Sequence, residues 1–156
     1  MRRLALIALP LTLAACQQQA APAPAQAVVE ATGPWCRPTP NGRDMTACYI
    51  TLTSSTGDRL TSIISPRAAQ SEVHAVSTEG GVMSMTPMSG GLELPAGQAV
   101  VLAPGGDHIM LTGVTVPLAE GDLVPLALTF DSGVQIALEA AVRADAPGSE
   151  PAHAAH

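Results

Sequence analysis

The sequence predicts an all-β domain with antiparallel strands packed as a sandwich or a barrel. Short runs rich in β-branched and aliphatic residues recur along the chain, and Gly, Pro, Asp and Ser separate them. Strands at such short intervals are typical of sandwiches and barrels. The chain has only one Trp, one Tyr and one Phe, so the core of the domain must be aliphatic.

The individual strands follow from these runs. Residues 46–53 are rich in β-branched side chains and end at the turn residues 54–58. Residues 136–141 would also suit a helix, but they follow a hairpin-like Asp-Ser-Gly sequence at 131–133, which favours a last strand. In chain order, we expect strands at 46–53, 59–64, 72–77, 82–85, 98–102, 108–111, 123–130 and 134–142.

The N-terminus has the features of a targeting segment. Arg2 and Arg3 precede the apolar stretch 4–13, which is too short to cross a bilayer. The stretch runs into Leu-Ala-Ala before Cys16, a sequence that resembles the lipobox of bacterial lipoproteins. This resemblance implies cleavage before Cys16 and diacylglycerol on its sulfur, and an ordinary secretory peptide is the alternative. Because Gln17 and not aspartate follows, we expect a periplasmic protein anchored by lipid to the outer rather than the inner membrane.

Composition divides the chain into a signal peptide at 1–15, a flexible tether at 16–27, one domain at 28–143 and a disordered tail at 144–156. Without Arg2 and Arg3, five of the seven basic residues remain against thirteen acidic ones, which gives a formal net charge of −8. Nucleic acid is therefore not expected as a partner, because phosphate binding needs a basic surface.

Two further cysteines, Cys36 and Cys48, are expected to form a disulfide. They flank the turn-rich segment 38–42, and an even pair in an oxidising compartment is typical of a structural bond. A copper-binding or redox thiol pair is the alternative, but their spacing is unlike that of Cys-x-x-Cys motifs.

Four residues are candidates for binding a soft metal ion: His74, Met85, His108 and Met110. Thioether sulfur combined with imidazole nitrogen suits Cu(I) far better than Mg²⁺ or Ca²⁺. His108 and Met110 lie two apart in a predicted strand and should therefore share a face. Any one of these residues alone would more often be a packing or surface residue, so the joint pattern carries the prediction.

The spacing of these residues resembles the signature of the PCu(A)C family of periplasmic copper chaperones, which is His, ten residues, Met, about twenty-one residues and His-x-Met. Here ten residues separate His74 from Met85, and twenty-two separate Met85 from His108, one more than in the signature. Further segments also resemble the family, and together they extend the likeness over residues 28–142: 49–52, 65–66, 80–85, 94–97, 104–111 and 126–130.

The resemblance implies a cupredoxin-like β-sandwich in which the four candidate residues ligate one Cu(I). It also implies a chaperone that delivers copper to cytochrome c oxidase, through its dinuclear copper centre or the proteins that assemble it. Met83 is a candidate extra ligand beside Met85. His153 and His156 in the tail are candidates for Cu(II), as in the tails of some family members.

Two acidic residues lie close in sequence to the predicted ligands. Glu72 or Asp107 could orient a ligand imidazole.

A copper buffer or resistance lipoprotein would have the same site without a dedicated recipient, and a structural lipoprotein without metal would use the same residues for packing. An enzyme is not expected, because the sequence has no Gly-x-Ser-x-Gly, no His-Glu-x-x-His and no nucleophile–base pair at a recognisable spacing.

Overall fold

The computed structural model describes residues 27–145, and within them the chain forms strands and no helix. No helix in this range is therefore long and apolar enough to cross a membrane. The all-β prediction is confirmed, and residues 136–141 lie in a strand. The strands are β1 (Val29–Cys36), β2 (Met45–Ser54), β3 (Asp58–Ile64), β4 (Gln70–Glu79), β5 (Val82–Pro87), β6 (Leu92–Leu94), β7 (Ala99–Leu102), β8 (His108–Thr112), β9 (Leu123–Phe130) and β10 (Gln135–Val142).

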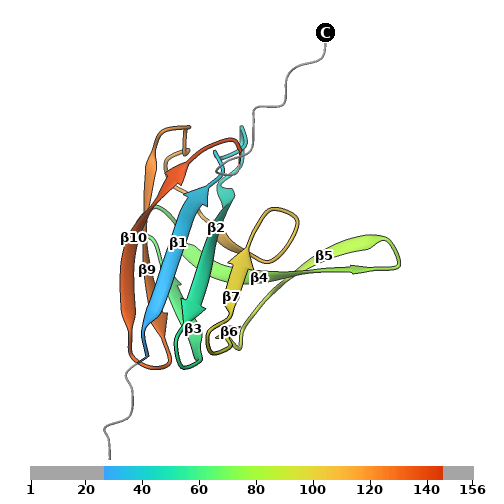
Figure 1. Cartoon of the computed structure of the whole chain (residues 1–156). Coiled ribbons are helices and arrows are strands. Elements are labelled where there is room, and N and C mark those ends of the chain that lie inside the picture. The colour runs from blue at the N-terminus through green and yellow to red at the C-terminus, as the bar shows by residue number, and fades with distance from the viewer. Residues whose placement is uncertain (1–26, 146–156) are drawn as a thin grey trace, which may run out of the picture.

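The strands form one hydrogen-bonded path that folds over into a sandwich. Their order is β5-β4-β8-β2-β1-β10-β9-β3-β6, and β7 pairs separately with β2. Figure 1 shows β10, β1, β2 and β7 in one layer, with β9 and β3 behind them. Neighbouring strands are antiparallel except β1 and β10, which are parallel.

The core between the layers is aliphatic, as the composition predicted. Its fully buried side chains include Leu52, Leu60, Ile109 and Leu128, together with the single ring of Phe130. Alternate residues of the strands supply these side chains, because successive side chains of a strand point to opposite faces. Trp35 and Tyr49 are also buried but lie outside the core cluster.

Two strands were not predicted, β1 and β6. Gly33 and Pro34 interrupt the apolar pattern of β1, and the pairing of β1 with β2 shifts register between Thr32 and Trp35. Gly33 has a φ of 60°, in the left-handed region that favours glycine, so the strand continues through a bulge. The three residues of β6 are too few to give a periodic signal.

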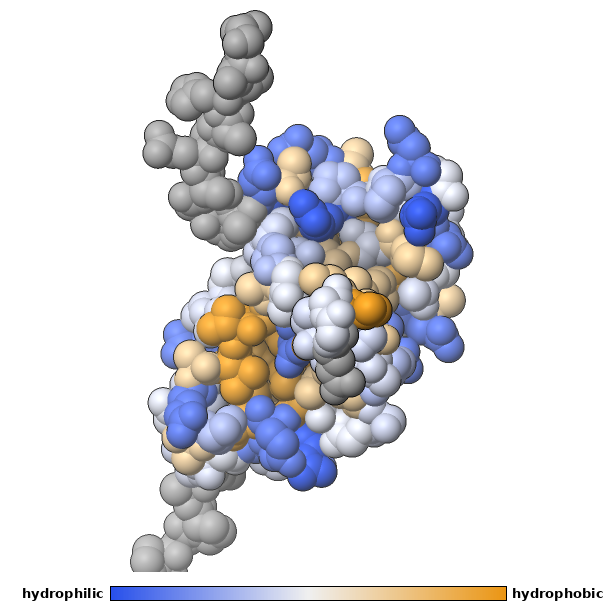
Figure 2. All heavy atoms as spheres, turned by 90° about the vertical axis from the view of Figure 1, so that its right-hand side faces the viewer, coloured by the Kyte–Doolittle hydropathy of each residue, from blue (hydrophilic) through white to orange (hydrophobic). Residues whose placement is uncertain are grey.

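The β4–β5 hairpin projects from the sandwich (Figure 1). β5 ends the order of strands, so it pairs with β4 alone, and all its residues are exposed. Figure 2 views the molecule from the side to which the hairpin points, where apolar surface lies in separate patches among polar residues. Val82, Met83 and Met85 of this hairpin are more than half exposed.

Candidate metal centre

Two of the predicted ligands are direct neighbours across β4 and β8. These strands pair antiparallel with His74 opposite His108, and the centroids of the two imidazole rings are 6.0 Å apart. His108 is buried, whereas the side chain of His74 is 17% exposed. The pair therefore has one nearly enclosed ring and one that solvent reaches.

The two predicted methionine ligands share the face of this histidine pair. Met110 lies two residues after His108 in β8. Met85 of β5 lies opposite Val76 of β4, which is two residues after His74. Both are thus diagonal neighbours of His74, one on each side, at a spacing that long side chains can bridge. The backbone brings all four predicted residues to one face of β5-β4-β8.

The other methionines near the site divide between the two sides of the sheet. Met83 lies opposite Thr78, on the same face as Met85 but one step further towards the hairpin tip. Met88 is partly buried against the hydrophobic core, and its N–H donates to the carbonyl of Val73 at 2.8 Å. Met85 is therefore nearer to the histidine pair than Met83, and Met88 is a packing residue.

A backbone carbonyl orients the ring of His108. Its Nδ1 lies 3.0 Å from the carbonyl oxygen of Gly106. Because that oxygen can only accept, Nδ1 carries the hydrogen, and in the neutral ring Nε2 then keeps its lone pair. This arrangement is the usual one for a histidine that binds a metal through Nε2.

Neither acidic residue orients an imidazole in the way considered from the sequence. The carboxylate of Asp107 instead accepts the backbone N–H of Val76 at 3.0 Å, so it joins β4 to the turn before β8. Glu72 Oε2 lies 3.7 Å from Nε2 of His74, beyond the distance of a hydrogen bond. The orienting group for His108 is a main-chain atom, which residue types do not reveal.

A row of rings extends from the histidine pair across the sheet, and the sequence did not predict it. Trp35 pairs with Tyr49 across β1 and β2, with ring centroids 4.5 Å apart. The ring of Tyr49 is in turn 6.4 Å from that of His108. Burial raises the pKa of Tyr49, and the nearby charge of Arg37 opposes this only in part. Tyr49 therefore stays neutral as it covers one side of His108.

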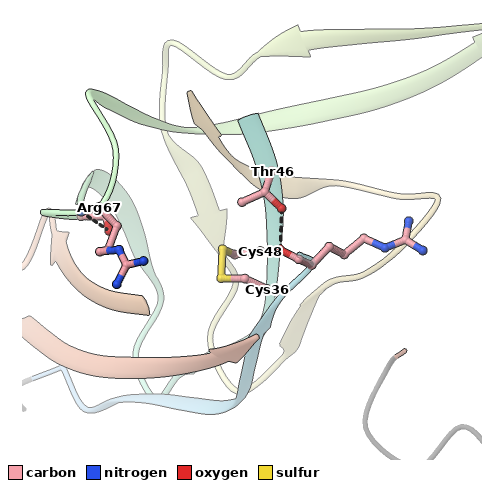
Figure 3. Close-up of a disulfide and its surroundings, with 6 residues drawn as sticks. Cys36, Thr46, Cys48 and Arg67 are labelled. Carbon is pink, nitrogen blue, oxygen red and sulfur yellow. Dashed lines mark hydrogen bonds between the residues drawn. A yellow bond between two sulfur atoms is a disulfide. The ribbon is translucent and has the colours of Figure 1, made fainter. Parts of the chain in front are cut away.

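The disulfide lies on the opposite face of the same strands. Cys36 and Cys48 pair across β1 and β2 and are joined by a bond, as predicted, and both are fully buried in the core. Beside them, the hydroxyl of Thr46 donates to the carbonyl of Arg37 at 2.7 Å (Figure 3). The bond fixes the two strands that carry Trp35 and Tyr49, and it leaves no thiol for a metal in this pair.

Three predicted residues lie outside the described part of the chain: Cys16, His153 and His156. Within residues 27–145, no three His, Cys, Asp or Glu side chains are grouped to hold a metal ion. Any further ligand that this part of the chain supplies to a metal at the histidine pair would therefore be of another type. The thioethers of the neighbouring methionines are such groups.

Comparison with known proteins relates the chain to lipoproteins and to copper-binding domains. It is 34% identical to the lipoprotein Lxx21020 of Leifsonia xyli subsp. xyli over 94 residues, which are 59% of this chain and 57% of that protein. It is 28% identical to the Cu(I) form of DR1885 from Deinococcus radiodurans, with a TM-score of 0.57 and coverage of 84% and 87% of the two chains. The copper-bound PCuAC domain from PmoF2 shares the fold, with a TM-score of 0.62, 22% identity and coverage of 75% and 93%.

The model of the LpqE-like lipoprotein family matches residues 29–142, nearly the whole described domain. The solved PCuAC domain shares the fold, so the cupredoxin-like sandwich predicted from the sequence is confirmed, and the match to the family model confirms the predicted family. The chain belongs to the LpqE-like lipoproteins of the PCuAC family.

Proposed function

We propose that this protein binds one Cu(I) through His74, Met85, His108 and Met110 and passes it to a cuproprotein. One observation carries the proposal: a cross-strand histidine pair has a methionine as diagonal neighbour on each side, all on one face. The Cu(I)-bound relative DR1885 supports the choice of metal.

The donor set favours the reduced ion. Two imidazoles and two thioethers are neutral and soft, and this combination suits Cu(I). A blue-copper centre needs a thiolate, and Cys36 and Cys48 are held in a buried disulfide. The proposed role is therefore transport of the ion, not electron transfer or catalysis.

The exposure of the ligands suits transfer to a partner. Met85 is 53% exposed on an edge strand, whereas His108 is buried and oriented by Gly106. A partner ligand can replace the thioether of Met85 first, while His108 still holds the ion. Copper then moves by stepwise exchange and is never released as a free ion.

The recipient that we propose is the dinuclear copper centre of cytochrome c oxidase or its assembly proteins. Family resemblance suggests this recipient, and the lipoprotein names of the relatives support a lipid anchor at Cys16, outside the described residues. The anchor would hold the site near a periplasmic membrane, and we propose the outer one. The tail residues His153 and His156 would capture Cu(II).

Titration with Cu(I) against a chromogenic chelator tests the site. We expect His108→Ala, Met110→Leu and Met85→Leu each to weaken Cu(I) binding by about tenfold or more, because each removes a donor atom. Met88→Leu is the matched control, since Met88 packs against the core, and it should leave the affinity unchanged. Met83→Leu should have a smaller effect than Met85→Leu.

Two further measurements test the ligand count and the role. X-ray absorption of the Cu(I) form should show two sulfur and two nitrogen neighbours, as the proposed ligand set requires. Deletion of the protein should lower oxidase activity when copper is scarce. Sensitivity to excess copper without an oxidase defect would instead point to a buffer, and a wild-type protein that binds no Cu(I) would contradict the proposal altogether.

A further inference from the structure

A hollow of ≈ 470 Å³ opens beside the proposed copper site. Met110, a proposed ligand, forms part of its wall, and Met45 and Ala47 of β2 lie on the same side. Pro38 and Pro40, from the turn between β1 and β2, give it a mainly apolar lining. A molecule seated in this hollow would contact a copper ligand directly.

The hollow also carries positive charge in an otherwise acidic protein. The mature chain has no lysine and five arginines, and two of these, Arg37 and Arg43, line the hollow. Two of the other arginines are occupied elsewhere: Arg59 pairs with Glu93, and Arg67 lies 3.9 Å from Asp122.

The arginines at the hollow have no such partner in residues 27–145. The ion pairs of this range include neither Arg37 nor Arg43. Asp44 and Asp145 are close to the hollow in sequence, but neither lines it. Arg37 does interact with the hydroxyl of Tyr49, but neither guanidinium is paired with a carboxylate of the described residues. Guanidinium groups beside an apolar hollow are suited to binding carboxylates.

We propose that this hollow, lined by Arg37, Arg43, Met45 and Met110, is the docking site for an acidic segment of the protein that exchanges copper with this chain. An apolar side chain of the segment fills the hollow, and its flanking carboxylates pair with the two arginines. The link to copper exchange rests on the proposed function, whereas the docking itself does not.

Charge complementarity favours a short acidic segment over an extended polyanion. The mature chain has a formal net charge of −8, so the two arginines form a small basic site on an acidic protein. A nucleic acid or an anionic membrane would bring many negative charges against it, whereas a peptide carries only a few. Such pairing also aligns the partner, because it fixes which ligand of the site the partner meets first.

Peptide binding to the full mature chain tests the proposal. The probe is a fluorescein-labelled peptide in which glutamates flank a Leu-Met pair, and its counterpart has glutamine at every glutamate. By fluorescence anisotropy at low salt, we expect the acidic peptide to bind about threefold to thirtyfold more tightly than the neutral one. The preference should decrease as salt is added.

Charge-matched variants locate the site. The double variant Arg37→Gln/Arg43→Gln should lose the preference for the acidic peptide, and Arg37→Lys/Arg43→Lys should keep most of it. Arg59→Gln/Arg67→Gln removes the same charge elsewhere and should behave like the wild type. Circular dichroism checks that each variant folds, and the comparison of the two peptides on the unmodified protein needs no variant at all.

Several results would overturn the docking site. These are equal binding of the two peptides, equal loss in both Gln double variants, or binding to phosphatidylglycerol vesicles that the acidic peptide does not displace. Cu(I) titration separates this outcome from failure of the proposed function. The Arg37→Gln/Arg43→Gln variant should bind Cu(I) as the wild type does, and a wild type without Cu(I) affinity would refute the function and not the docking.

Discussion

Breaking the Cys36–Cys48 bond should lower the stability of the domain by a predictable amount. The bond closes a loop with a sequence separation of 12, and both cysteines are fully buried. In the chain-entropy model such a loop contributes about 3 kcal/mol to the free energy of unfolding. For a domain of about 120 residues this corresponds to a melting temperature lower by roughly 12 °C.

Urea unfolding of the oxidised protein, the reduced protein and the Cys36→Ala/Cys48→Ala variant measures this loss. With a slope of about 2 kcal/mol/M, the midpoint of unfolding should fall by roughly 1.5 M on reduction. The double variant should lose somewhat more, because it also removes two buried sulfur atoms from the core.

The same samples give a second readout, Cu(I) affinity. The sulfur atoms lie on the core side of β2 and not on the face of the histidine pair. Affinity should therefore stay constant at temperatures where the reduced protein remains folded. An unchanged urea midpoint on reduction would refute the reasoning, because the bond would then not constrain the unfolded chain.

Three further outcomes are expected. Burial alone would raise the pKa of Asp58, but hydrogen bonds from the Ser132 hydroxyl and the N–H groups of Arg59 and Ser132 outweigh it, so the pKa lies below its usual 3.8. The ionised Asp58 carboxylate therefore stabilises the folded state above pH 3.8, and this stabilisation is lost as the pH falls through the pKa of the folded state. Asp58→Asn should lower the free energy of unfolding at neutral pH but change it little in strong acid, as measured by urea unfolding across pH. Gly91→Ala should cost at least about 1 kcal/mol more than Gly133→Ala: both have positive φ, but only at Gly91 would a Cβ lie 2.6 Å from a backbone oxygen. Cu(I) binding should change the fluorescence emission of Trp35, the one tryptophan, because its ring contacts Tyr49 and the ring of Tyr49 is next to His108. The double variant His74→Ala/His108→Ala should abolish this change.

Local sequence patterns were enough for most of the fold. Runs such as that of β2 and β9 predicted their strands, because β-branched and aliphatic side chains between turn residues suit a buried sheet. Strand β1 was missed because Gly33 and Pro34 break its pattern, and only pairing with β2 keeps the two halves in one strand. The strand propensity of individual residues does not reveal a strand that is maintained by pairing with another strand.

Without the family resemblance, the arrangement of the site was predictable only where it depends on short spacing. The two-residue interval of His108 and Met110 predicted a shared face, and the register of β8 with β4 bears this out. The covering of His108 by Tyr49 depends on the pairing of β2 with β8, which are far apart in sequence. The hydrogen bond from His108 to Gly106 uses a carbonyl that every residue possesses, so no residue type could indicate it.

The position of β5 at the end of the sheet has a kinetic consequence for the proposed copper site. The amides of an edge strand that pairs on one side can open without unfolding the domain, at a cost well below the global free energy of unfolding. Met85 would then leave the ion through fraying of the hairpin, while the central strand β8 keeps His108 and Met110 in place. The residence time of copper would thus follow the hydrogen-exchange rate of the β5 amides. A mutation at the hairpin turn would then change how fast copper leaves without altering any ligand.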